Sequence, residues 1–290
     1  MHRWTLKQKG FTIVELLIVI VVIGILAAIT IVSFNGVQNR AKIASVQTDL
    51  TNAAQSLETY KYSNSSVEAY PVDLTAANLK SSNGTSYQYT VNNVVSPASY
   101  CLNAGNGTTI DYFISNANTT PQIGGCPTTN LVTNPSFETN TNDWSAVGST
   151  IVRSTEQKYV GQASLKVTPS AAPYNGTAFT AAGTIGVQYT FSAYVYSPTS
   201  QYINFAADCC GNANPVIGPS WQRIVVSGVR VNNQPFYIRA IGSGGLPFYV
   251  DAVMISESTS AYDYKDGTFT SNSWIWSGTA NNSTSSGSSQ

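Results

Sequence analysis

The stretch KGFTIVELL, Lys9 to Leu17, runs directly into IVIVVIGILAAITIVSF, Ile18 to Phe34. Together they predict the first structural element of the chain, a long apolar helix. The apolar run from Ile13 to Phe34 has 22 residues, which as a helix is about 33 Å long and matches the hydrocarbon core of a bilayer. The run contains one carboxylate, Glu15. Because an acid at the centre of a membrane helix costs about 2.5–3.5 kcal/mol on insertion scales, Glu15 requires a compensating partner.

The residues that precede the apolar run distinguish it from an ordinary secretory signal. Arg3, Lys7 and Lys9 should keep this end in the cytoplasm by the positive-inside rule. A secretory signal has an apolar core of about 7–15 residues followed by a small residue at the cleavage site, whereas here the run is longer and Gly10 comes before it. Cleavage after Gly10 would remove residues 1–10 and leave the apolar helix on the mature chain.

The motif KGFTIVELL resembles the processing site of type IV pilins and related pseudopilins, in which a membrane peptidase cleaves after the glycine and methylates the new N-terminal residue. The resemblance implies that Gly10 ends the leader peptide and that Phe11 becomes the N-methylated terminus. It also implies that Glu15 pairs with the Phe11 ammonium of a neighbouring subunit during assembly. The alternative is a plain membrane anchor with an incidental acid.

The pairing of Glu15 with an N-terminal ammonium has a physical rationale. A free amine at Phe11 is a cation at the start of the helix, where Glu15 also meets the positive end of the helix dipole. Buried charges are tolerated when they are paired, and removing one partner from a buried pair costs about 3–5 kcal/mol. The pair would fix the axial register of one helix against the next.

The helix is expected to continue to about Tyr62, so that residues 11–62 form one long helix and residues 11–34 its membrane or filament-core part. Apolar residues repeat at spacings of three and four on one face: Ile43, Val46, Leu50, Ala53, Leu57 and Tyr60. Polar residues are expected opposite them: Asn39, Arg40, Lys42, Gln47 and Asp49. This pattern predicts packing on the chain's own globular head, and the alternative is a coiled-coil seam with a partner.

Residues 63–127 are predicted to form a small head. SYQYTV, SYCLNA and IDYFIS (86–91, 99–104 and 110–115) alternate like short antiparallel strands separated by Asn, Gly and Pro. Together with the helix they would make an α+β pilin domain. Many pilins close a C-terminal loop with a cysteine pair, which implies a disulfide between Cys101 and Cys126 worth about 3 kcal/mol in the chain-entropy model. Free buried thiols are the alternative.

A second domain is predicted at residues 128–257, where several short motifs follow one another: NLVTNPSFET (130–139), GQASLKV (161–167), YTFSAYVYS (189–197), WQRIVVSG (221–228) and FYVDAVMI (248–255). Their order and spacing resemble carbohydrate-binding modules of the jelly-roll type that are grouped as families four and nine. About eight or nine short strands at this spacing suit an all-β sandwich of two sheets.

Sugar binding in such a fold uses aromatic faces together with amides and carboxylates. The candidate aromatic residues are Tyr174, Tyr202, Trp221, Phe236 and Tyr237, and the candidate polar residues are Asp208, Asn212 and Asn214. Trp144 and Trp221 also match positions where the family has core tryptophans, so packing is the alternative for both. Relatives hold a structural calcium, and Glu138 and Asp251 match its carboxylate positions, which suits the oxygen ligands that Ca²⁺ prefers.

The remaining cysteines and the last segment leave alternatives open. Cys209 and Cys210 are adjacent, so they could form a vicinal disulfide, which we favour, or stay free or bond to other chains. Residues 258–290 resemble the tail that follows such modules in some phage and surface proteins. Their Ser/Gly-rich end is expected to be disordered.

Composition limits the function. Lys+Arg and Asp+Glu both number 14 and give a formal net charge of zero, so nothing predicts a nucleic-acid partner. The single histidine is His2, in the leader, which removes histidine-based zinc sites and Ser-His or Cys-His catalysis from the mature chain.

The sequence therefore predicts a non-enzymatic type IV pilus subunit, minor or tip, with an adhesive glycan-binding domain. It would cross the cytoplasmic membrane once before assembly and then lie in a surface pilus. Its partners would be other pilin subunits, the prepilin peptidase, the assembly machinery and a glycan. The alternatives are a pseudopilin of a type II secretion system and, less favoured, a membrane-tethered glycosidase, which would need two suitably spaced carboxylates.

Overall fold

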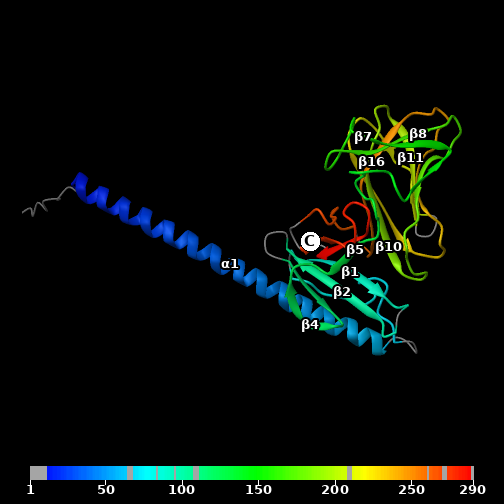
Figure 1. Cartoon of the computed structure of the whole chain (residues 1–290). Helices are drawn as coiled ribbons and strands as arrows, with labels where there is room; N and C mark the ends of the chain where they lie inside the picture. Colours follow the sequence, from blue (N-terminus) through cyan, green and yellow to red (C-terminus); the bar gives the residue numbers. More distant parts are fainter. Residues whose placement is uncertain are drawn as a thin grey trace, which may run out of the picture. The chain divides into compact units, whose positions relative to one another are not determined.

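The structure is a computed structural model that describes residues 12–63, 68–82, 84–94, 96–106, 111–207, 211–259, 261–269 and 273–288. The chain divides into two compact units, Met1–Ser45 and Val46–Gln290. Helix α1 spans Ile13–Ser63 (Figure 1), and its end agrees with the predicted end near Tyr62. The predicted leader and Phe11 lie outside the described residues.

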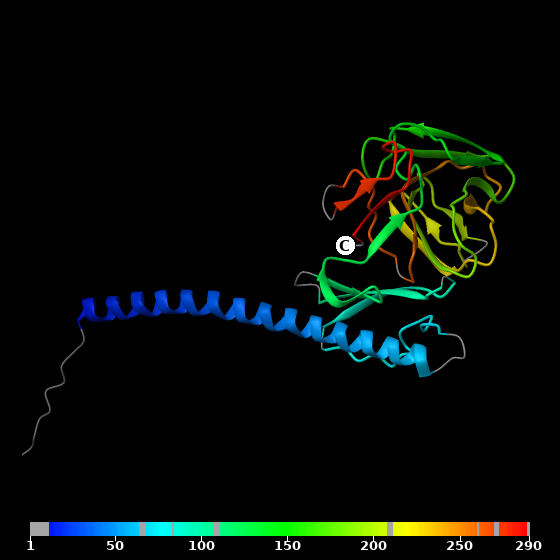
Figure 2. The same cartoon turned by 60° about the horizontal axis from the view of Figure 1, so that its bottom comes forward.

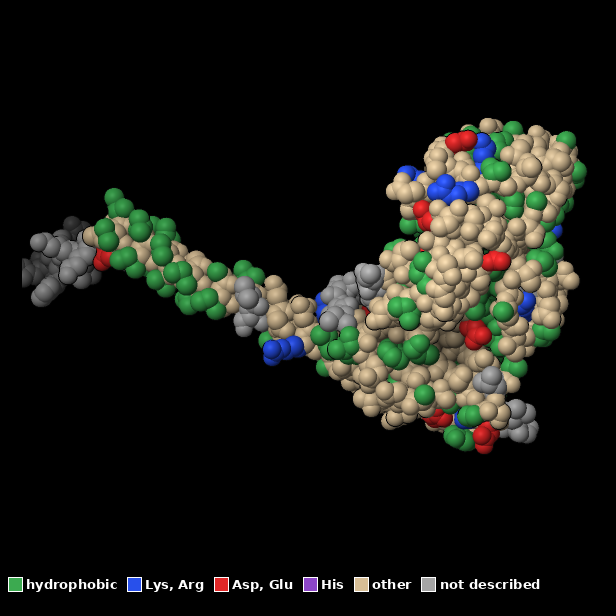
Figure 3. Space-filling model, viewed as in Figure 1, with side chains coloured by type: hydrophobic (Ala, Val, Ile, Leu, Met, Phe, Trp, Pro, Cys, Tyr) green, Lys and Arg blue, Asp and Glu red, His purple; other side chains and the backbone are tan. Residues whose placement is uncertain are grey.

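The first unit is an exposed apolar helix in its described part. Side chains from Ile13 to Ile31 are largely exposed, with Ile13 at 86% and Ile31 at 61%, and apolar side chains cover much of the side seen in Figure 3. By length and composition this helix is apolar enough to cross a membrane. A surface of this kind is stable in lipid or against other helices rather than in water.

The second unit begins with the C-terminal part of α1, which packs as the helical periodicity predicts. Val46, Leu50, Ala53 and Leu57 are almost fully buried. Asp49 was predicted on the face opposite these residues, but its side chain is buried, where it accepts hydrogen bonds from the Ser82 backbone N–H at 2.8 Å and hydroxyl at 3.0 Å. A buried carboxylate is tolerated here because the loop supplies donors.

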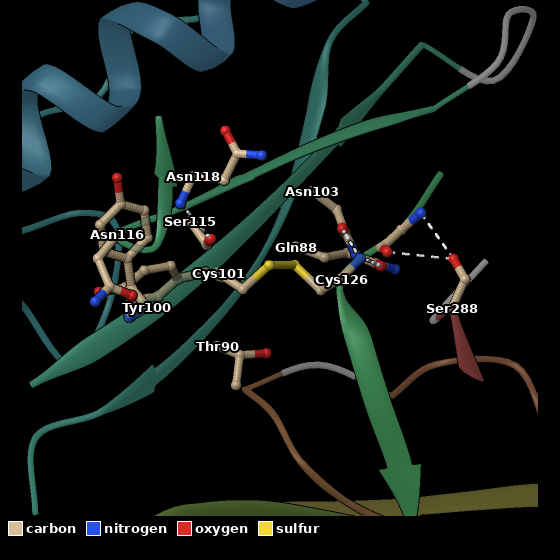
Figure 4. Close-up of a disulfide and its surroundings, with 12 residues drawn as sticks. Gln88, Thr90, Tyr100, Cys101, Asn103, Ser115, Asn116, Asn118, Cys126 and Ser288 are labelled. Atoms are coloured by element: carbon tan, nitrogen blue, oxygen red, sulfur yellow. Dashed lines mark hydrogen bonds between the residues drawn. A yellow bond between two sulfur atoms is a disulfide. The ribbon is translucent and has the colours of Figure 1, made fainter. Parts of the chain in front are cut away.

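The head sheet has the antiparallel order β1-β2-β3-β4, with strands at Ser86–Asn92, Ser99–Gly105, Tyr112–Ser115 and Asn118–Ile123. It lies beside the C-terminal part of α1 in both views (Figure 1, Figure 2). The predicted disulfide is present: Cys101 of β2 is bonded to Cys126, with 6.0 Å between their Cα atoms (Figure 4). The bridge ties the middle of the sheet to the point where the head ends.

The second domain, residues 128–257, which we call the module, is a sandwich of two antiparallel sheets. The first sheet has the order β14-β10-β16-β8-β7, with strands at Gln222–Val229, Gln188–Tyr196, Phe248–Glu257, Ser164–Pro169 and Ser149–Ser154. The second sheet has the order β12-β11-β15-β9-β6, with strands at Gly211–Ala213, Gln201–Ala207, Phe236–Ala240, Asn175–Phe179 and Trp144–Val147, and β13 (Val216–Ile217) also pairs with β11. The fold class predicted from the sequence is confirmed.

The core of the module lies between the two sheets and follows the strand alternation. Phe191 of β10 and Phe205 of β11 stack with ring centroids 4.1 Å apart, and both are almost fully buried. Phe236 and Trp144 join the same cluster. Burial of each large apolar side chain contributes about 1.5–3 kcal/mol, so this core accounts for the stability of the sandwich.

The C-terminal tail, defined as residues 258–290, differs from the expectation of a disordered end. Strands β17 (Ile275–Trp276), β18 (Ser285–Ser288) and β5 (Pro127–Asn130) form a sheet in the order β17-β18-β5. Tyr262, Tyr264 and Trp274 pack on Ala252 and Met254 of β16. The described tail is therefore integrated into the module, because its aromatic side chains and backbone find partners that its Ser/Gly-rich composition does not reveal.

Candidate functional site

Strand alternation exposes a polar and aromatic surface on the outside of the second sheet. In β11 and β15 every second side chain enters the core, for example Phe205 and Ile238, so the residues between them face outward. We define the second-sheet face by these outward residues and the neighbouring Tyr174: Tyr174, Tyr202, Asn204, Tyr237 and Arg239. Tyr202 is 59% exposed and Tyr174 is 51% exposed.

Arg239 organises this face. Its Nε and Nη2 donate to Oδ1 of Asn204 at 3.1 and 2.8 Å, and the Nδ2 of Asn204 donates to Oδ1 of Asn214 at 2.9 Å. The guanidinium carbon lies 4.3 Å from the Tyr237 ring centroid and 5.7 Å from that of Tyr174. Asn204 is buried and held at both ends, which fixes the orientation of the guanidinium between the two rings.

Tyr174 is presented by an unusual backbone conformation. Its φ is +59°, in the left-handed region that bulky residues seldom adopt. Its N–H donates to the Ala240 carbonyl at 2.7 Å, which holds the turn against the end of β15. Strained residues that persist in this way occur at binding sites more often than elsewhere, and here the strain places an aromatic ring at the surface.

The structure separates the residues proposed as sugar contacts. Tyr174, Tyr202 and Tyr237 come together on the second-sheet face, and Asn212 of β12 is exposed on the same sheet, where it pairs with Ala206. Phe236 was a wrong prediction, because its side chain is fully buried in the core. Trp144 packs in the core, as its alternative interpretation states.

The remaining residues that were predicted from the sequence do not lie on the second-sheet face or are not described. Trp221 directly precedes β14, which belongs to the first sheet. Asp208, Cys209 and Cys210 lie outside the described residues. Asn204 and Arg239 were missed, although alternation in QYINFAA and FYIRA would have placed both on the same face as Tyr202 and Tyr237.

The two carboxylates proposed for calcium lie near each other. Asp251 is fully buried and accepts hydrogen bonds from the N–H groups of Tyr159 at 2.8 Å and Val160 at 3.0 Å. Glu138 accepts from Gln162 N–H at 3.0 and 2.9 Å. Burial, with the nearby charge of Glu138 as a smaller contribution, raises the pKa of Asp251 to about 7.

The buried Asp251 and the nearby Glu138 form a pair of carboxylates that a bound metal ion would stabilise. A cation would offset the repulsion between the two carboxylates, and each carboxylate oxygen can accept more than one bond. The described residues contain no cluster of three or more His, Cys, Asp or Glu side chains that could hold a metal. Glu138 and Asp251 therefore fit a calcium ion only if backbone carbonyls complete its coordination.

A cavity of about 840 Å³ lies away from both of these sites. Its lining comes from the head, from β5 and the residue after it, from the end of β16 and from the tail, and includes Phe113, Leu131 and Ile275. Glu257 is an acidic group in this lining, and its carboxylate accepts a hydrogen bond from the Tyr189 hydroxyl at 3.1 Å. The second-sheet face does not contribute to this cavity, so the two are separate features.

Glu15 forms hydrogen bonds with Thr12 at the N-terminus of its own helix. The Thr12 N–H and hydroxyl both donate to Oε2 of Glu15 at 2.8 Å, and the Glu15 N–H donates to the Thr12 hydroxyl at 3.2 Å. This reciprocal arrangement is a capping box. The sequence signal for it, Thr followed three residues later by Glu, is part of the motif quoted for processing.

Comparison with known proteins identifies the N-terminal part. Residues 5–31 match the family model described as the prokaryotic N-terminal methylation motif. The chain is 35% identical over 128 residues to the type IV wide pilus major component PilA4 of Thermus thermophilus, covering 44% of this chain and 92% of that protein. The chain belongs to the type IV pilin family. This pilin is also 36% identical over 62 residues to the type II secretion system core protein G of Escherichia coli, of which it spans 43%.

The module of this pilin matches a different family. Residues 129–215 match the model described as a carbohydrate binding domain. The solved CBM22-1 xylan-binding domain of Paenibacillus barcinonensis Xyn10C is similar at 17% identity and a TM-score of 0.36, covering 44% of the pilin and 93% of that chain. The C-terminal family 22 module of Clostridium thermocellum Xyn10B is similar at 18% identity and a TM-score of 0.35, covering 44% and 94%.

Proposed function

We propose that this pilin is a minor or tip subunit of a type IV pilus that assembles through its N-terminal helix and presents a glycan-binding module at the cell surface. The observation that carries the proposal is a pilin sequence that covers 92% of a pilus component and continues into a module with a carbohydrate-binding match. The exposed rings of the second-sheet face in that module supply a surface suited to sugars.

Assembly rests on the N-terminal residues. The prepilin peptidase cleaves after Gly10 and methylates Phe11, and Glu15 then pairs with the Phe11 ammonium of a neighbouring subunit. The capping box offers Glu15 hydrogen bonds from Thr12 inside its own chain, so the acid has a partner before a neighbour arrives. An exposed apolar helix of this length is held in the cytoplasmic membrane before assembly and in the filament core afterwards.

Glycan binding rests on the second-sheet face. Tyr174, Tyr202 and Tyr237 offer amphipathic rings on which the apolar face of a pyranose can stack. Arg239 and the exposed amide of Asn214 offer donors and acceptors for hydroxyl groups, and the buried Asn204 holds both in place. Because Asn204 and Arg239 are already oriented by one another, little side-chain freedom is lost when a sugar binds.

The minor or tip role is proposed because the part added to the pilin domain is large. The module and tail, residues 128–290, form the larger part of the second unit. A domain of this size on every subunit would crowd a filament shaft. The matched families, pilins and carbohydrate-binding modules, are non-catalytic, and we propose no enzymatic activity. Calcium is proposed as a structural ion held by Glu138, Asp251 and backbone carbonyls.

The glycan proposal is tested on the full mature chain in detergent, with an immobilised panel of xylohexaose, cellohexaose and mannohexaose. Tyr174→Ala and Tyr202→Ala should each weaken binding at least tenfold. Tyr62→Ala, which removes an exposed tyrosine from helix α1, is the matched control and should bind as the wild type does. Equal binding by all four proteins, or no binding of any sugar by the wild type, would show that the second-sheet face is not a glycan site.

A pseudopilin role in type II secretion is the second candidate, because the N-terminal region matches core protein G of several species over about a fifth of this chain, for example 35% identity over 65 residues in Pseudomonas aeruginosa. These matches span less than half of each secretion protein, as in the 44% covered in Pseudomonas aeruginosa. Purified surface filaments decide between the candidates. Pili that contain this chain favour the pilus role, whereas its absence from pili together with a secretion defect on deletion favours the pseudopilin role.

A further inference from the structure

The outer face of the first sheet carries a row of aromatic side chains. This row is separate from the second-sheet face. Tyr159 and Tyr194 stack with ring centroids 3.6 Å apart and an interplanar angle of 13°. Trp221 lies 6.0 Å from Tyr159 and 5.6 Å from Tyr196. Tyr196 lies 5.9 Å from Tyr249. We call these five residues the aromatic row.

The strand register places the row outside the core. Tyr194 pairs with Arg223 of β14 and Tyr196 pairs with Tyr249 of β16, while the alternate residue Val195 is fully buried in the core. Neighbouring strands thus project these rings from the same face of the sheet. The row and the second-sheet face lie on opposite outer surfaces of the sandwich, because the core separates the two sheets.

The tail covers one part of this outer face and stops at the row. Tyr262, Tyr264 and Trp274 cover Ala252 and Met254, and Tyr194 packs at the edge of that cluster. Beyond it three rings are accessible, because Tyr159 is 46% exposed and Tyr196 and Trp221 are partly exposed, whereas Tyr249 is buried. Arg223 joins the tail to the row, since it donates to the Tyr262 carbonyl and forms an ion pair with Asp263 at 3.3 Å.

Paired polar groups border both ends of the row. At one end the Tyr249 hydroxyl donates to Glu156, which forms an ion pair with Lys166 at 2.7 Å. At the other end are Arg223 and Asp263. Lys166 and Arg223 each have a carboxylate partner, so the polar groups at the two ends of the row are balanced in charge. Accessible rings flanked by balanced hydrogen-bonding groups suit a neutral ligand with both apolar and hydroxyl faces.

We propose that the aromatic row is a second glycan-contact surface, which takes neutral pyranose chains and lies on the opposite side of the module from the second-sheet face. The proposal rests on the proposed glycan-binding function of the module. A module with contacts on both sides can engage two glycan chains at once. The second engagement then takes place at a high effective concentration, which slows detachment without strengthening either contact.

The test uses calorimetric titration of the full mature chain in detergent with xylohexaose, cellohexaose and mannohexaose, with carbene footprinting of the best-binding sugar. We expect two sites per wild-type chain and protection of Tyr159 and Trp221. The double variant Tyr159→Ala with Trp221→Ala should retain one site with unchanged affinity. Tyr159→Phe should keep both sites, because its ring still stacks on Tyr194.

The matched control is Val225→Ala, which truncates an apolar side chain, 41% exposed, on β14. It should keep two sites, and the melting temperature of every variant checks that it is folded. One site in the wild type, with no protection of Tyr159 or Trp221 and complete loss of binding in Tyr174→Ala, would overturn this inference and leave the proposed function standing. No binding of any hexasaccharide by the wild type would overturn both.

Discussion

Thr12 and Glu15 bond to each other in both directions at the start of α1, so the acid that makes this membrane helix unusual is satisfied locally. Replacement of Glu15 by Val should leave membrane insertion intact, since it makes the helix more apolar. It should reduce incorporation into filaments at least tenfold, because a buried Phe11 ammonium left unpaired costs about 3–5 kcal/mol.

Immunoblots of sheared filaments and of membranes measure the two effects of Glu15→Val separately. Ile18→Val, a nearly neutral change on the same helix, is the control and should assemble normally. Normal amounts of the Glu15→Val chain in filaments would contradict the pairing of Glu15 with Phe11.

Asp251 supplies the residue-scale test for calcium. Adding Ca²⁺ to the chelated wild type should raise its melting temperature by several degrees, because the ion offsets the repulsion between two carboxylates. Asp251→Asn should abolish this response, while Glu257→Gln, on the same strand, should retain it. A melting temperature that is insensitive to chelation and to Ca²⁺ would exclude the ion.

Individual site residues were predictable only where the local pattern determines their surroundings. The exposure of Tyr174 and Tyr202 follows from their positions near turns. Phe236 was misplaced because two neighbouring aromatic residues face opposite sides of β15, and the correct parity depends on its pairing with β9 and β11. The burial of Asp49 depends on the distant loop at Ser82 and leaves no local trace in the helix pattern.

At the scale of elements, the Cys101–Cys126 bridge closes a loop with a sequence separation of 25 residues. Replacing both cysteines with serine should lower the free energy of unfolding by about 3 kcal/mol in the chain-entropy model. Denaturant unfolding of wild type and variant, each with and without reductant, measures this difference. Reductant should destabilise only the wild type, and equal stability of the oxidised wild type and the variant would contradict the prediction.

The tail provides the second test at this scale. Removal of residues 261–290 uncovers Ala252 and Met254 and deprives β5 of its partner. Burial of Tyr262, Tyr264 and Trp274 contributes about 1.5–3 kcal/mol per side chain, so the truncated chain should melt well below the wild type and aggregate through the exposed β5 edge.

Thermal unfolding and light scattering measure these effects of the truncation. Ile275→Ser is the matched control, because Ile275 belongs to the tail but is 66% exposed. It should leave the melting temperature nearly unchanged. A truncated chain as stable and soluble as the wild type would show that the tail contributes no stability.

Elements with a strong local period were predicted well from the sequence, and elements defined by distant partners were not. The helix and the first head strands are recognisable by spacing alone. Strand β18 has the sequence SSGS, which has poor strand propensity. It forms because its backbone pairs with β5 and because Trp274 donates to the Ser288 carbonyl at 2.7 Å.

At the scale of the whole molecule, the position of the chain along the pilus tests the minor or tip role. Antibodies against the module should mark a few sites per filament, mainly at ends, because a bulky module on every subunit would crowd the shaft. Electron microscopy of gold-labelled filaments makes the measurement, with an antibody against the major subunit as the control. Dense labelling along the shaft would identify this chain as the major subunit instead.

The pairing of β18 with β5 also has a consequence for biogenesis. Thr129 and Ser286 meet although they are 157 positions apart, and Ser288 contacts Gly125 next to the Cys126 bridge (Figure 4). Contacts between residues so distant in the sequence raise the contact order of the fold and slow its formation. We therefore expect the β5–β18 pairing to form late in folding, after the intervening strands of the module.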